Sequence, residues 1–167
     1  MKSIALLATL FLGTSALAAE GKPEIVRPMA KPQAVGLKHT VRTFPEACAR
    51  ITGVFTGKPA DPYSFAITKT DPRCAPRAEL VDAKKVGAAT GAGWVFHDLV
   101  QVPSAACPSQ MATVRVWRDS AKLAPPKLDA QGRSRVYAAD AQAAKQPGAV
   151  KLPRFAVAMS LEGKACK

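Results

Sequence analysis

Hydrophobic and polar residues alternate along much of this chain in short segments, the pattern of half-buried β-strands. In segment 154–162, for example, Phe155, Val157, Met159 and Leu161 fall on one side of an extended strand. Comparable segments, separated by stretches with glycine or proline, lie at residues 40–44, 48–56, 63–69, 78–86, 93–102, 112–118 and 133–138. This spacing predicts an all-β protein, an antiparallel β-sandwich or small barrel of about 7–8 short strands.

Two segments depart from the strand pattern. Residues 137–146 are rich in alanine and are followed by Pro147-Gly148, so we predict one short helix there. Residues 19–39 are rich in proline and lysine and contain few apolar residues. That composition predicts an extended, largely unpaired tail, with a docked edge strand around Ile25 as the alternative. The remaining residues, 40–167, are predicted to form a single β domain.

The first residues have the features of a secretory signal peptide. Lys2 precedes an apolar run at 4–12, and small residues follow it. The run is too short to span a bilayer, which takes about 20 residues. We expect residues 1–18 to be removed by cleavage after Ala18, or alternatively after Ala19. The protein is then expected in the periplasm or secreted, and no membrane-spanning segment is expected in the rest of the chain.

The four cysteines all lie in the part predicted to be exported, and an even number in an oxidising compartment predicts two disulfides. No two cysteines are close enough to form a C-x-x-C pair, so we expect neither a metal site nor another cofactor. Antiparallel pairing brings together the outer ends of neighbouring strands. Cys48 and Cys74 flank one predicted hairpin, and Cys107 and Cys166 flank a second pair of strands. The predicted disulfides are therefore Cys48–Cys74 and Cys107–Cys166.

The sequence shows no catalytic constellation, and we predict no catalytic residue. A nucleophilic hydrolase needs a base beside its nucleophile, and the only imidazole bases are His39 and His97. Strand alternation around His97 would point Asp98 into the core unless a β-bulge turned it outward. We interpret this point as a bulge or edge position with solvated polar groups. A small hydrolase that uses His97 and Asp98 remains the alternative.

Positive charge is concentrated toward the C-terminus. The formal net charge is +12, and residues 112–167 contain eleven Lys and Arg against four Asp and Glu. Arginine beside an aromatic ring can bind carboxylates or phosphates, or stack on flat groups. Strand periodicity places such residues together in two segments, which predicts a binding face formed by Arg115, Trp117, Arg133, Arg135 and Tyr137. The alternative is that Trp117 faces the core and that the charge serves solubility.

These features predict an exported, non-enzymatic binding protein whose basic face meets an anionic component of the cell envelope. That component would be a polymer, a lipid surface or an acidic protein. An exported enzyme inhibitor or assembly partner that binds through its loops is the alternative. Nucleic acid is not expected as a partner, because export separates the protein from it.

Overall fold

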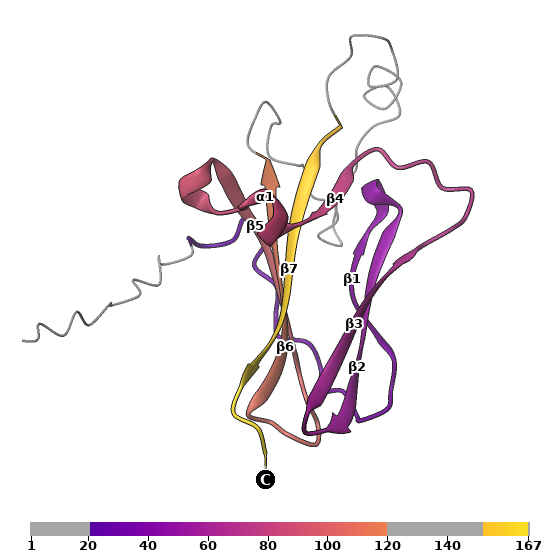
Figure 1. Ribbon diagram of the computed structural model, residues 1–167, viewed down its shortest axis with the longest axis vertical. Helices are drawn as coiled ribbons and strands as arrows, with labels where there is room; N and C mark the ends of the chain where they lie inside the picture. The colour runs from indigo at the N-terminus through magenta and orange to yellow at the C-terminus, as the bar shows by residue number, and fades with distance from the viewer. Residues whose placement is uncertain (1–20, 120–151, 167) are drawn as a thin grey trace, which may run out of the picture.

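The computed structural model describes residues 21–119 and 152–166 (Figure 1). The elements in chain order are β1 (His39–Phe44), η1 (Pro45–Ala47), β2 (Ala49–Lys58), β3 (Asp61–Lys69), β4 (Glu79–Asp82), α1 (Ala83–Val86), η2 (Thr90–Ala92), β5 (Trp94–Pro103), β6 (Gln110–Asp119) and β7 (Arg154–Gly163). The predicted strand at 133–138, the predicted helix at 137–146 and the predicted signal peptide lie outside the described residues.

The strands form two sheets that face each other (Figure 1). One sheet has the order β1-β2-β3, and the other has the order β4-β7-β6-β5. Neighbouring strands are antiparallel except β4 and β7, which are parallel. The chain crosses from one sheet to the other between β3 and β4. Within the described ranges the strands do not close into a barrel. The predicted sandwich is therefore confirmed.

The main hydrophobic core fills the space between the two sheets. Its members that are at most 2% exposed include Phe44, Ile51, Phe55, Val114 and Val116. Val114 and Val116 are two positions apart on β6, so the strand presents both to the facing sheet. Each such side chain contributes about 1.5–3 kcal/mol by leaving water. The alternating pattern in the sequence thus corresponds to this buried layer.

The four-stranded sheet also buries part of its other face, here called the outer face. Phe96, Trp117 and Ala156 form a second apolar cluster there with Ala83 of α1. The ring centroids of Phe96 and Trp117 are 5.8 Å apart. The segment from α1 to η2 therefore covers one end of the outer face. This explains why β6 has apolar residues on both of its sides, at even-numbered and at odd-numbered positions.

Helix α1 corrects one prediction, because residues 83–86 were expected to continue a strand that began at residue 78. The Asp82 side chain accepts hydrogen bonds from the amides of Lys84 and Lys85 and so caps the first turn. Gly87 ends the helix in the left-handed conformation, at φ 60°. These local hydrogen bonds satisfy backbone groups of residues 83–87 within one helical turn. Only residues 79–82 pair as a strand.

Both predicted disulfides are present. Cys48 and Cys74 have Cα atoms 5.8 Å apart, and those of Cys107 and Cys166 are 5.6 Å apart. The first links the start of β2 to the connection that leaves the three-stranded sheet. The second links the β5–β6 turn to the segment after β7. In the chain-entropy estimate each contributes about 3–4 kcal/mol by restricting the unfolded chain.

The N-terminal segment 21–38, here called the strap, is paired with the sandwich, so the prediction of a largely unpaired tail is wrong for these residues. The strap follows the outer edge of β5 and then crosses to the other sheet (Figure 1). The edge contact considered at Ile25 is confirmed by its bridge to Asp98. Strap amides donate to carbonyl oxygens in the pairs Glu24–Phe96, Ile25–His97, Ala30–Gln101, Gln33–Pro103 and Gly36–Phe55. These bonds cover backbone groups that an edge strand would otherwise leave open.

We predict that Gly53→Ala destabilises the fold, because the Tyr63 ring lies directly on this glycine. A Cβ atom at residue 53 would come within 1.7 Å of the Tyr63 hydroxyl oxygen. The ring would have to move, which we expect to lower the free energy of unfolding by about 1–3 kcal/mol. Gly91→Ala is the control, since a Cβ there meets nothing within 4 Å. Urea denaturation measures both, and equal stability of the two variants would contradict the prediction.

Candidate functional site

A cluster of charged residues, here called the buried cluster because His97, Asp98 and Arg118 in it are buried, lies where β5 carries a β-bulge. The pairing of β5 with β6 shifts register between Phe96 and Asp98, so His97 is the extra residue. His97 is 1% exposed and Asp98 is 0% exposed. The predicted bulge is therefore present, but the expectation that its polar groups are solvated is wrong. Both side chains point into the protein, where other polar groups meet them.

The Asp98 carboxylate joins three parts of the molecule. Its oxygens lie 2.7 Å from Nε of Arg27 and 2.8 Å from Nε of Arg42. Arg27 belongs to the strap and Arg42 to β1 of the facing sheet, while Asp98 itself is on β5. Burying a carboxylate costs free energy unless the charge is paired, so Asp98 can occupy this position only with its two arginine partners.

The Glu24 carboxylate makes a second set of contacts in this cluster. Arg118 holds it through two bonds, of 2.8 Å from Nε and 2.5 Å from Nη2. His97 Nδ1 lies 2.8 Å from the same carboxylate. The bonds from Arg118 hold the pKa of Glu24 below its ordinary value. Burial lowers the pKa of His97, although Glu24 acts in the opposite direction.

The geometry gives this cluster a structural role. Glu24 and Arg27 are both strap residues, and each is held by an ion pair to the sandwich. The His97 imidazole contacts the Glu24 carboxylate and the Phe155 ring. At 1% exposed it offers no approach to a substrate. The cluster fastens the strap along β5.

We predict that Asp98→Asn costs about 3–5 kcal/mol of unfolding free energy, because it leaves the partly buried guanidinium groups of Arg27 and Arg42 without their counter-charge. Asp71→Asn is the matched control. The Asp71 side chain is 51% exposed and its ion-pair partner Arg73 is 92% exposed. That exposed pair contributes at most about 1 kcal/mol. Chemical denaturation at neutral pH compares them, and a cost for Asp98→Asn no larger than the control's would overturn the structural role.

The cluster also predicts how stability depends on pH. The lowered pKa of His97 means that the unfolded chain binds a proton more readily below pH 6.5, so unfolding becomes easier as the pH falls through that value. The lowered pKa of Glu24 stabilises the fold above pH 4.5, and that contribution is lost as the pH falls through the folded value. We expect His97→Gln to remove the first decline and retain the second. Urea unfolding over a pH series measures this, and an unchanged profile in the variant would refute it.

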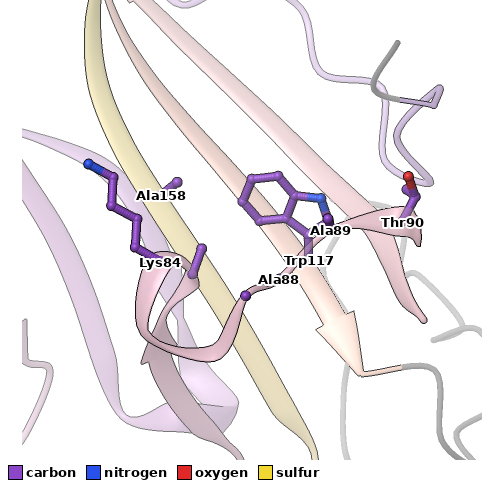
Figure 2. Close-up of a pocket in the computed structure, with 8 residues that line it drawn as sticks. Lys84, Ala88, Ala89, Thr90, Trp117 and Ala158 are labelled. Carbon is purple, nitrogen blue, oxygen red and sulfur yellow. The ribbon is translucent and has the colours of Figure 1, made fainter. Parts of the chain in front are cut away.

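A pocket of about 460 Å³ lies on the outer face of the four-stranded sheet, between β6, β7 and the segment from α1 to η2 (Figure 2). Trp117 of β6 and Ala158 of β7 contribute the sheet side of the pocket, with the indole ring lying along it. The lining residues are Ala83, Lys84, Gly87, Ala88, Ala89, Thr90, Trp117 and Ala158. Small side chains at five of these eight positions leave the space open beside the indole.

Two of the residues predicted to bind, Arg115 and Trp117, lie at or next to this pocket. They share the outer face, two positions apart on β6, and Arg115 is opposite Ala158 in the β6–β7 pairing. Arg115 forms an ion pair with Glu162, and its hydrogen bond lowers the pKa of that carboxyl. Trp117 is 6% exposed and packs in the second apolar cluster, yet it also lines the pocket.

The other three predicted binding residues, Arg133, Arg135 and Tyr137, lie outside the described residues. Sequence reasoning missed the contribution of Lys84 to the pocket, because it placed residues 78–86 in one continuous strand. A usable signal was present in the sequence. Asp82 precedes and Gly87 follows a four-residue segment, the arrangement of an N-cap and a C-terminal glycine.

Across residues 21–119 and 152–166, no three or more His, Cys, Asp or Glu side chains are grouped so that they could hold a metal ion. In the same ranges no helix is both long and apolar enough to cross a bilayer. Comparison of the chain with protein-family models, with curated proteins and with solved structures gives no match. The function therefore has to be argued from the site itself.

Proposed function

We propose that this is an exported, non-enzymatic binding protein that holds an anionic component of the cell envelope against the outer face of its four-stranded sheet. The observation that carries the proposal is the pocket beside Trp117. Lys84 lines this pocket, and Arg115 lies next to its Ala158 wall. An aromatic surface with cations beside it suits a ligand that carries negative charge.

Export is supported by the cysteine chemistry and by the N-terminal pattern. All four cysteines are in disulfides, and such bonds persist in oxidising compartments. The sequence before residue 19 matches a secretory signal peptide in its basic start, its short apolar run and its small residues. The anionic surfaces available outside the cytosol are lipid headgroups, envelope polymers and acidic proteins.

The distribution of charge supports an anionic partner. In the buried cluster, Arg27, Arg42 and Arg118 are engaged by the carboxylates of Glu24 and Asp98. These arginines serve the fold. Because three arginines meet two carboxylates, this cluster accounts for only about one unit of the net charge of +12. Most of the surplus is carried by other cations, and Lys84 at the pocket is among the exposed ones. A strongly positive protein attracts anionic surfaces over several ångströms at low salt.

We predict salt-sensitive binding of residues 19–167 to vesicles of anionic phosphatidylglycerol, with little binding to neutral phosphatidylcholine. Co-sedimentation at about 50 mM and about 300 mM salt measures it, since screening weakens exposed charge interactions. Arg115→Gln should weaken binding about fivefold, the effect of one cation near an anionic surface.

The matched control is Arg73→Gln, an exposed arginine on the connection between β3 and β4. Binding that is absent at low salt, or that does not change with salt, would count against the proposal. So would equal weakening by both substitutions, because the outer face would then have no special role.

A protein partner is the second candidate, favoured by apolar side chains that the strap exposes. Val26 is 67% exposed, Met29 is 58% exposed and Leu37 is 55% exposed. Exposed apolar residues gathered in one segment suit an enzyme inhibitor or assembly partner. In that case a pull-down from an envelope extract would recover one stoichiometric protein, and Met29→Ser would weaken its capture while Arg115→Gln would not.

A further inference from the structure

The lining of the outer-face pocket is mainly apolar. Alanine and glycine supply five of its eight residues, and the Trp117 indole supplies its one large aromatic surface. Its volume of about 460 Å³ lies within the range of about 300–1,000 Å³ that small-molecule sites occupy. Such a space suits an apolar group that lies against the indole.

One cation lines this apolar pocket. The Lys84 side chain extends from α1 on the far side of Ala158 from the Trp117 ring (Figure 2). The nearest acid in sequence, Asp82, uses its carboxylate to accept the amides of Lys84 and Lys85. Within the described part of the chain no carboxylate pairs with the Lys84 ammonium. The pocket therefore combines an apolar interior with one positive charge that is available to a ligand.

Backbone hydrogen bonds hold the covering segment in place. Gly87 closes α1 through bonds from its amide to the carbonyl oxygens of Ala83 and Lys84, and the Ala88 amide also donates to Ala83. Further along, the Trp94 amide donates to the Ala89 carbonyl at 3.2 Å. A site that is formed before its ligand arrives binds without paying the entropy of ordering a loop.

We propose that this pocket binds a small amphipathic monoanion, with its apolar tail against Trp117 and its charged group at Lys84. The inference rests on the proposed function, because it specifies the ligand of the same outer face. Two sources share this chemistry: a free fatty acid, and an anionic lipid whose chain enters the pocket from a membrane. The apolar lining accounts for the tail, and the lone cation accounts for the single charge.

Titration with octanoate, followed by NMR of the Trp117 indole N–H and the amides of residues 83–90, tests the proposal. Octanol, which has the same chain without the charge, and acetate, which has the charge without the chain, should both bind more weakly than octanoate. Lys84→Gln should weaken octanoate binding about tenfold, because it removes a charge-assisted bond. Lys85→Gln is the matched control, since it makes the same change on the same helix at a residue that does not line the pocket. Ala158→Leu, checked for folding by urea denaturation, should fill the pocket and abolish binding.

Vesicle binding separates the two sources and the two proposals. If Lys84→Gln weakens octanoate binding and Ala158→Leu abolishes it, but both leave binding to phosphatidylglycerol vesicles intact, the ligand is a free amphiphile. If both kinds of binding fall, the ligand is the membrane lipid itself. Salt-sensitive vesicle binding without octanoate binding, or equal effects of Lys84→Gln and Lys85→Gln, would overturn the pocket proposal and leave the proposed function standing. Octanoate binding without vesicle binding would support the pocket proposal and count against the proposed function.

Discussion

The buried carboxylate of Asp98 links three parts of this structure: the strap, β1 and β5. It lies on a bulge of β5 at 0% exposure, and its charge is balanced by Arg27 of the strap and Arg42 of β1. The strap must therefore reach β5, and β1 must approach the same point from the facing sheet. Glu24 adds a second attachment through Arg118 and His97. Strap docking and the meeting of the two sheets are thus parts of one electrostatic arrangement.

This arrangement separates the charges of the protein into two groups. The arginines of the buried cluster are paired with carboxylates and stabilise the fold. Cations such as Lys84 remain at the surface, where they give the protein its attraction for negative partners. The pocket brings one of these cations beside an apolar, partly aromatic wall. The proposals for an anionic partner and for an amphipathic ligand both follow from that combination.

The pocket exists because the four-stranded sheet is buried on both faces. The inner face packs against the facing sheet, and the outer face is covered at one end by the segment from α1 to η2. This cover uses alanine and glycine where it crosses Trp117, so it does not fill the space above the indole. Two-sided burial also explains how Trp117 can lie at 6% exposure while it shares a face with Arg115. Trp117 is therefore neither a residue of the core between the sheets nor a solvent-exposed residue.

The sequence by itself determined both disulfides and, within the described residues, the strand segments apart from 83–86, because alternation and cysteine position report local extension and which strand ends meet. Its predictions failed where distant residues decide the structure. Nothing near Asp98 in the sequence indicates that Arg27 and Arg42 surround it, 71 positions away in the first case. The strap, rich in proline and poor in apolar residues, has the composition of a free tail. Only the open edge of β5 and the ion pairs that Asp98 and Arg118 of the sandwich make with the strap explain its docking. The pocket likewise required the tertiary structure, because its walls come from a helical turn, a loop and two strands. Burial, pairing of charge and the filling of space are properties of surfaces brought together from separate parts of the chain, and local sequence patterns do not encode which surfaces meet.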